Sequence, residues 1–222
     1  PFSVNYKKKF DYSEKEEINI IIQALKLNIF DSYSKEEKNL NGRRSVISFL
    51  NSTMKTDYKI DDGIIIFNSN NSRIKNTKIN YDGELSINPF DLNLNINLNN
   101  YELYKILNIN SILNELIKTE LLFNDNISIS TSIIATLNPK EKIFKKAKIN
   151  FNISNGKINF DKTKLINKEI GSLKLENSNL YFKNAVLILN TDIVIDINNN
   201  DKLFSLLQTN KQFRKPIKNI LI

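Results

Sequence analysis

The feature that most constrains the fold of this chain is a strict alternation of apolar and polar residues. The stretch 91–98 reads Asp-Leu-Asn-Leu-Asn-Ile-Asn-Leu, so that every second residue is aliphatic. The same period recurs in residues 127–133, 149–154 and 192–198. Successive side chains of a β-strand point to opposite faces of a sheet. The pattern therefore predicts strands with one dry face and one face in water.

Strands of this kind favour an antiparallel sheet, because parallel strands are usually covered on both faces and are apolar throughout. Three dipeptides with the chemistry of tight turns lie between apolar runs, namely Asp62-Gly63, Asp82-Gly83 and Asn155-Gly156. Each of them predicts a β-hairpin. The expected fold class is mainly β and antiparallel, with a few short helices.

The helical signals are few. Ser13 followed by Glu16 has the spacing of a capping box and predicts a helix that runs to about Leu25. Apolar spacing predicts two more helices, at residues 103–107 with an extension over 109–123, and at residues 203–207. The charged and polar residues from Tyr33 to Asn41 are interpreted as a loop.

The glycines, five in all, reveal an internal repeat. The first copy contains Ile60-x-x-Gly63-x-Ile65-x-Phe67 and Gly83-x-Leu85-x-Ile87, and the second contains Ile153-x-x-Gly156-x-Ile158-x-Phe160 and Gly171-x-Leu173-x-Leu175. A small sheet with one dry face must cover that face, and stacked copies would form an elongated body with a continuous apolar face. The predicted segments are residues 1–57 (helix plus loop), 58–125 (first β-repeat with a closing helix) and 126–222 (second β-repeat, truncated).

Composition removes many kinds of chemistry. The chain has no His and no Cys, which excludes His-based triads, thiol nucleophiles, disulfides and the ordinary zinc, haem and iron–sulfur sites. Asp61-Asp62-Gly63 and Asn198–Asp201 offer oxygen ligands, but they lack the spacing of a calcium loop and are interpreted as a turn and a helix N-cap. We expect no catalytic residue, no cofactor and no metal.

The net charge of +8 comes almost entirely from lysine. Basic clusters occur at Lys7-Lys8-Lys9, Arg43-Arg44, Lys145-Lys146-x-Lys148 and Arg214-Lys215. Proteins that read nucleic acids tend to combine arginine forks with aromatic stacking faces, and no such pattern accompanies these clusters. The sequence favours solvated lysine faces over nucleic-acid binding. A nucleic-acid-binding domain is kept as a rival hypothesis.

Neither end of the chain resembles a natural boundary, since it begins at Pro1 and finishes in an apolar run. We interpret it as a fragment of a longer protein. No stretch reaches the roughly 18–20 apolar residues of a membrane-spanning helix, and no signal peptide is visible.

The turn glycine with its flanking Ile and Phe, the Gly-x-Leu-x-Leu strand and the alternating strand before a short helix form a recognisable combination. Residues 155–160, 170–173, 177–180, 195–197 and 203–208 carry it most fully. In these features the chain, from Tyr58 onward, resembles the AsmA-like proteins of Gram-negative bacteria, the group of AsmA, TamB and YhdP. The motifs are degenerate and include no catalytic signature.

The resemblance implies an elongated, curved antiparallel sheet with an apolar groove. It implies a periplasmic protein that is anchored in the inner membrane by an N-terminal helix and acts in outer-membrane biogenesis. The implied partners are the membrane and a phospholipid or other envelope lipid, which the protein shelters or conducts between the two membranes. The residues expected to line the groove are Leu92, Leu94, Ile96, Leu98, Ile127, Ile129, Ile133, Ile149, Phe151, Ile153, Leu173, Leu175, Ile193, Ile195 and Ile197.

The same residues have a plainer interpretation as an ordinary closed core, because packed cores are the common fate of such faces. In that case the chain would be a structural or adhesive β-repeat module of a cell-surface protein, built as a closed sandwich. An open apolar face and a face clamped between two sheets are therefore the alternatives that a structure must separate.

Overall fold

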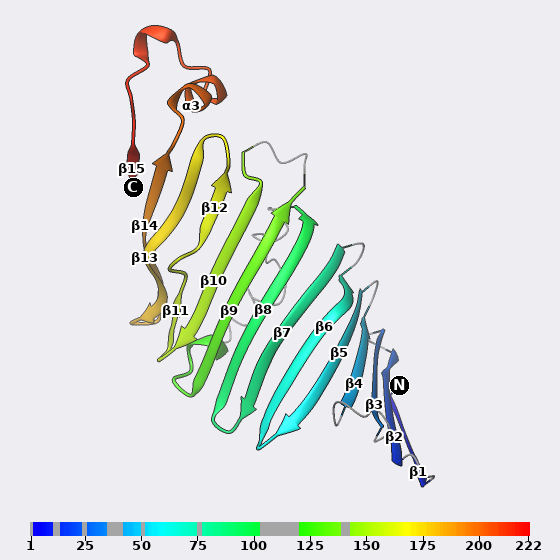
Figure 1. Ribbon diagram of the computed structural model, residues 1–222. Coiled ribbons are helices and arrows are strands. Elements are labelled where there is room, and N and C mark those ends of the chain that lie inside the picture. The colour runs from blue at the N-terminus through cyan, green and yellow to red at the C-terminus, as the bar shows by residue number, and fades with distance from the viewer. Residues whose placement is uncertain are drawn as a thin grey trace. The chain divides into compact units, whose positions relative to one another are not determined.

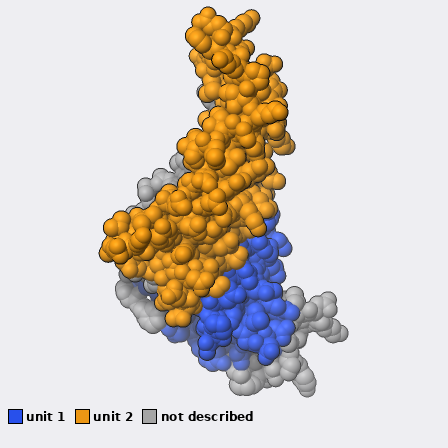
Figure 2. Space-filling model, turned by 90° about the vertical axis from the view of Figure 1, so that its left-hand side faces the viewer, with its two compact units in different colours: residues 1–98 blue, residues 99–222 orange. Residues whose placement is uncertain are grey.

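The computed structural model describes residues 2–10, 14–23, 26–34, 42–49, 52–74, 77–102, 120–138 and 143–222. The chain divides into two compact units, unit 1 at residues 1–98 and unit 2 at residues 99–222 (Figure 2). These units do not coincide with the three predicted segments, since the strands of residues 1–57 pair with those that follow them.

Unit 1 is an antiparallel sheet in which each strand pairs with the next one along the chain (Figure 1). Its strands are β1 (Phe2–Phe10), β2 (Glu14–Ile22), β3 (Leu27–Ser34), β4 (Gly42–Phe49), β5 (Ser52–Asp61), β6 (Ile64–Ile74), β7 (Thr77–Ile87) and β8 (Phe90–Tyr101). The alternation that predicts β8 is confirmed. Leu98 is buried, whereas Asn93, Asn95 and Asn97 are exposed.

The helix predicted from Ser13 and Glu16 is wrong, because residues 14–22 form strand β2. The apolar residues Ile18, Ile20 and Ile22 alternate, and they pair with β1 on one side and β3 on the other. β-Branched side chains lose rotamer freedom in a helix and pack well on a pleated sheet. The prediction of helix plus loop for residues 1–57 is therefore wrong as well, because their described residues form strands. In the predicted loop 33–41, Tyr33 and Ser34 belong to β3 and the rest lies outside the described residues.

Two of the three predicted hairpin turns are confirmed. Asp62 and Gly63 join β5 to β6, and Asn155 and Gly156 join β10 (Lys146–Ser154) to β11 (Lys157–Asn159). All four residues have positive φ, as the tight turns of right-twisted hairpins require.

The third predicted turn, Asp82-Gly83, is wrong, because Gly83 lies inside β7 between Phe67 of β6 and Leu94 of β8. A Cβ at this position would collide with the backbone oxygen of Asn93 and would lie 2.7 Å from the Phe67 ring. Glycine is placed here by the close approach of two neighbouring strands and not by a turn.

Unit 2 contains β9 (Ile127–Leu137), β10, β11, β12 (Lys164–Asn167), β13 (Gly171–Lys183), β14 (Val186–Ile197) and β15 (Asn219–Leu221). These strands pair with one another in antiparallel orientation. Two short strands, β11 and β12, both lie between β10 and β13, one after the other along the chain. Residues 160–163 separate them, so this position in the sheet holds an interrupted strand. The proposed repeat matches Gly83 with Gly171, but the two glycines are not in equivalent positions. Gly83 lies inside β7, whereas Gly171 is the first residue of β13.

The helix predicted at residues 203–207 is confirmed as α3 (Asn200–Leu206), with Phe204 buried. Asn199 is its N-cap, and its side-chain oxygen accepts a hydrogen bond from the Lys202 N–H at 3.0 Å. The helix predicted over 103–107 and 109–123 lies mostly outside the described residues. Of that stretch, Leu121–Phe123 form a short 3-10 turn, η2.

The predicted fold class, mainly β and antiparallel with short helices, is confirmed by these elements. A buried cluster in unit 2 joins Leu122 of η2 to Ile153 of β10 and Ile158 of β11. Partly buried aromatic and aliphatic residues pack around it: Phe123, Ile127, Ile129, Phe151, Phe160 and Leu180.

Candidate functional site

The main candidate site is a continuous apolar face on the sheet of unit 1. Directly opposed residues of neighbouring strands share a face. Val4 lies opposite Ile20, Ile20 opposite Ile29, Ile29 opposite Ile47, and Ile47 opposite Met54. One row of apolar side chains thus crosses five strands without interruption.

The same register defines the whole of this surface, which we call the unit 1 apolar face. It comprises Val4, Tyr6, Ile18, Ile20, Ile22, Leu27, Ile29, Ile47, Phe49, Met54, Ile60, Ile65, Phe67, Ile74, Ile79, Tyr81, Leu85, Ile87, Phe90, Leu92, Leu94, Ile96 and Leu98.

Part of this face is open. Val4 is 51% exposed, Ile60 54%, Phe49 42% and Ile47 36%. Toward β7 and β8 the face is buried, since Ile79, Tyr81 and Leu98 are at most 8% exposed. Every described secondary-structure element of unit 1 is a strand of this one sheet. No described element of unit 1 therefore forms a second layer over the face. Soluble proteins seldom leave a contiguous apolar surface of this size in water unless it has a function.

A few polar side chains lie on the same face and satisfy one another. The Tyr58 hydroxyl donates to the Asp31 carboxylate at 2.7 Å, and the Thr56 and Tyr81 hydroxyls are 2.5 Å apart. Partial burial raises the pKa of Tyr58, and the hydrogen bond to Asp31 raises it further. Arg43 lies directly opposite Tyr58 and Tyr33, so the face contains a polar region on β3, β4 and β5 beside its apolar row.

Unit 2 has a corresponding apolar face, which is covered in part. The unit 2 apolar face consists of Ile127, Ile129, Ile133, Ile149, Phe151, Ile153, Ile158, Leu165, Leu173, Leu175, Leu180, Phe182, Ile193, Ile195 and Ile197. Residues of η2 pack on this face. Leu122 belongs to the buried cluster, and the Phe123 and Phe182 rings contact each other edge to face with their centroids 4.9 Å apart.

The fifteen residues predicted to line a groove therefore fall into two groups. Leu92, Leu94, Ile96 and Leu98 lie on the unit 1 apolar face, and the other eleven lie on the unit 2 apolar face. Most are half-buried, but Leu98, Ile153 and Ile197 are at most 8% exposed. Ile153 is a core residue beneath η2 and does not line an open surface.

The sequence prediction missed the apolar residues of β1 to β7. β1, β5 and β7 do alternate, so a signal for them was present in the sequence. In β2, β3, β4 and β6 both faces carry apolar side chains, as where Val46 precedes Ile47 or Ile64 precedes Ile65. The period of two is then hidden, although the high content of β-branched residues is a signal for strands.

The other candidate sites of the sequence have structural explanations. Asp61-Asp62-Gly63 is a hairpin turn, and Asn199 caps α3. Within the described residues, no group of three or more acidic side chains is placed to hold a metal ion. Arg44 forms an ion pair with Asp57 at 2.6 Å, and Arg43 stacks on the Tyr33 ring at 5.5 Å.

Comparisons with protein-family models, with curated proteins and with solved structures found no match. In the part of the chain that the structure describes, no helix combines the length and the apolar character needed to cross a membrane.

Proposed function

We propose that this chain is a non-catalytic segment of an AsmA-like periplasmic protein that shelters or conducts lipid between the inner and outer membranes. The observation that carries the proposal is the exposed part of the unit 1 apolar face, which includes Val4, Ile47, Phe49 and Ile60. The resemblance described above supplies the cellular setting, in which the full-length protein is anchored in the inner membrane and contributes to outer-membrane biogenesis.

The dimensions of the face suit an acyl chain. A strand of eight residues spans about 26 Å, whereas one leaflet of the hydrocarbon core of a bilayer is about 15 Å deep. A lipid tail laid along or across the strands would remove side chains such as Ile47 and Phe49 from water. Each Å² of apolar surface that becomes buried contributes about 25 cal/mol.

The alternative, a structural or adhesive β-repeat module, requires a closed sandwich in which two sheets face each other. Within each unit the described strands are hydrogen-bonded side by side into one sheet. This single layer favours the lipid proposal over the sandwich.

The test is extraction of lipid from the purified, folded chain, followed by mass spectrometry. We expect phospholipid to copurify with the wild-type protein. Ile47→Asn introduces an amide in the middle of the apolar face and should reduce the bound lipid severalfold.

Ile64→Asn is the matched control. Ile64 is 40% exposed, close to the 36% of Ile47, but it lies on the opposite face of the sheet because its neighbour Ile65 pairs with Ile60. A folded wild-type protein without lipid would refute the proposal. Equal lipid loss in the two variants would also count against it.

A further inference from the structure

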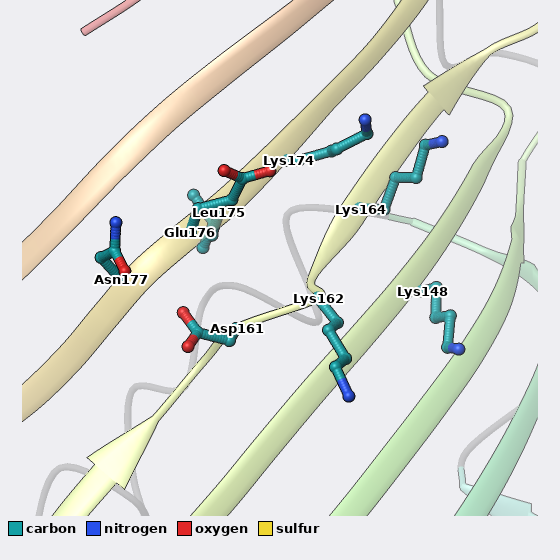
Figure 3. A pocket seen from close by; sticks show the side chains of 8 residues that line it. All are labelled: Lys148, Asp161, Lys162, Lys164, Lys174, Leu175, Glu176 and Asn177. Atoms are coloured by element: carbon teal, nitrogen blue, oxygen red, sulfur yellow. The ribbon is translucent and has the colours of Figure 1, made fainter.

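The polar face of unit 2 contains a lysine-rich pocket at the place where the strand between β10 and β13 is interrupted. The pocket has a volume of about 540 Å³. Its lining residues, shown in Figure 3, are Lys148, Asp161, Lys162, Lys164, Lys174, Leu175, Glu176 and Asn177. A volume of this size is within the range of small-molecule sites.

The backbone around the pocket is held by hydrogen bonds. The Thr163 hydroxyl accepts from the Asn150 N–H at 3.1 Å and donates to the Asn150 carbonyl oxygen at 3.0 Å. The Asp161 carboxylate accepts from the Ser178 N–H at 2.7 Å and from the Asn159 amide at 3.0 Å. These bonds fix the turn at residues 160–163 between two long strands, so the pocket is formed before any ligand enters.

Three of the lysines form a row across the sheet. Lys148 is directly opposite Lys164, and Lys164 is directly opposite Lys174. Neighbouring strands are about 4.8 Å apart, so the outer two lysines begin only about 10 Å from each other. Like charges in directly opposed positions destabilise a sheet.

The neighbouring carboxylates compensate for only part of this charge. Lys174 forms an ion pair with Asp196, and this contact raises the pKa of Lys174. Lys148, Lys162 and Lys164 form no ion pair with a described residue. In Figure 3 the carboxylates of Asp161 and Glu176 lie to one side of the pocket, and Lys148, Lys162 and Lys164 lie toward the other.

Lys162 adds a second irregularity. Its φ of +67° is in the left-handed region, where glycine and asparagine are common and a long side chain is unusual. Both the left-handed backbone of Lys162 and the row of opposed lysines lower the stability of the folded chain. A ligand with several negative charges would offset the repulsion between the lysines.

We propose that this pocket binds a phosphate group that carries two or more negative charges, as in a phosphomonoester or a pyrophosphate. A phosphomonoester carries a charge of about −1.5 to −2 at neutral pH. Its three terminal oxygens can accept hydrogen bonds from several ammonium groups at once. A carboxylate or a phosphodiester, with a single negative charge, would leave more of the lysine repulsion uncompensated.

The source of the phosphate can be a soluble compound or the headgroup of a lipid with a terminal phosphate. The proposal does not depend on the lipid-sheltering function, because that function rests on the unit 1 apolar face. The lysine row lies on the face opposite Leu165 and Leu173. Leu175 of the unit 2 apolar face also lines the pocket. Either proposal can fail while the other stands.

The test measures the binding of inorganic pyrophosphate to the whole chain by isothermal titration calorimetry and by thermal unfolding. The pocket variant is Lys148→Gln/Lys164→Gln, and it should bind pyrophosphate at least about tenfold more weakly than the wild type. Without ligand it should melt at a higher temperature, since two opposed charges are removed.

The control variant, Lys183→Gln/Lys215→Gln, removes the same net charge from exposed positions outside the pocket. It should keep the affinity of the wild type within about twofold, because exposed charges beyond the Debye length are screened. A third variant, Lys162→Gly, relieves the left-handed backbone and removes one ammonium group. It should remain folded and bind pyrophosphate more weakly.

Vesicles distinguish the two sources of phosphate. Preferential binding to phosphatidic acid over phosphatidylglycerol, lost in the pocket variant, would support a lipid headgroup. Pyrophosphate binding without that preference would support a soluble compound. No binding of the wild type to any probe would overturn the proposal. Equal weakening in the pocket and control variants would overturn it too, because it would indicate general surface charge.

Discussion

Replacing Gly83 by alanine is the sharpest test of how the strands of unit 1 are packed. Gly83 lies inside β7, and its two neighbours across the sheet are Phe67 and Leu94. A methyl group there would collide with the Asn93 backbone oxygen, and it would lie 2.7 Å and 3.1 Å from two carbons of the Phe67 ring. The ring can rotate away, but the Asn93 oxygen belongs to a strand that is itself paired with β7.

The expected cost follows from these contacts. Overpacking a well-packed site costs about 1–3 kcal/mol. Moving β8 away from β7 weakens one or two ladder hydrogen bonds, each with a net contribution of about 1 kcal/mol. We therefore expect Gly83→Ala to lower the free energy of unfolding by about 2–4 kcal/mol, a large part of the 5–15 kcal/mol typical of a folded domain.

The measurement is urea denaturation followed by far-ultraviolet circular dichroism. Gly63→Asn serves as the control, because Gly63 has no heavy atom within 4 Å of an added Cβ and has a φ of +79° that asparagine tolerates. The control should lose about 1 kcal/mol or less, because only its left-handed backbone opposes the new side chain.

The double variant Phe67→Ala/Gly83→Ala identifies the obstacle. It should recover only part of the loss caused by Gly83→Ala when compared with Phe67→Ala alone, since the Asn93 oxygen remains. A Gly83→Ala protein as stable as the wild type would refute the packing of β7 between β6 and β8.

Three further perturbations test other parts of the structure. Ile153→Ala should lower the free energy of unfolding by about 2–5 kcal/mol because Ile153 is 1% exposed, whereas Ile47→Ala on the open face should cost under about 1 kcal/mol, as measured by chemical denaturation. The pKa of Tyr58 is raised above 10.0 by burial and by Asp31, so its stabilising contribution is complete below pH 10 and is lost as the pH rises through the folded-state pKa. An ultraviolet tyrosinate titration of the wild type and of Tyr58→Phe should show this late-titrating group, and no difference between them at high pH would contradict the assignment. Asn199→Ala should destabilise unit 2 by about 0.5–2 kcal/mol through the loss of the α3 N-cap, and Asn199→Asp should retain most of the stability in thermal unfolding.

Local signals predicted the strands whose two faces differ in polarity. In β8 every wet position is occupied by Asn or Asp from residue 91 to residue 97, and the period of two is unambiguous. In β2 the run Ile20-Ile21-Ile22 places apolar side chains on both faces, and the spacing of Ser13 and Glu16 matched a capping box by coincidence. Pairing with β1 and β3 decided the outcome there, and that information is not local.

The prediction of turns was limited in the same way, because local sequence does not show which strands become neighbours. Asp62-Gly63 and Asp82-Gly83 are identical dipeptides between apolar runs, yet one is a hairpin and the other lies within a strand. What separates them is the presence of Phe67 and Asn93 next to Gly83, which becomes visible only when three strands are aligned. The sequence therefore predicted the fold class and two of the three hairpin turns correctly for local reasons, and it failed where neighbouring strands made the choice.

The candidate sites show this dependence on register more strongly. The cluster Lys145-Lys146-x-Lys148 was visible in the sequence, but only Lys148 of that cluster lines the pocket. Its partners Lys164 and Lys174 are 16 and 26 positions further along the chain, and no local pattern groups them with Lys148.

The alternation of side chains that predicts the fold also separates the two proposed activities. Along β13, Leu173 belongs to the apolar face and Lys174, the next residue, belongs to the lysine row. A single strand thus presents a surface for acyl chains on one side and a surface for phosphate on the other. If a lipid with a terminal phosphate were the ligand of both surfaces, one molecule would have to pass around an edge of the sheet or through its interrupted strand. Independent loss of phospholipid in Ile47→Asn and of pyrophosphate binding in Lys148→Gln/Lys164→Gln would show instead that the two faces bind separate ligands.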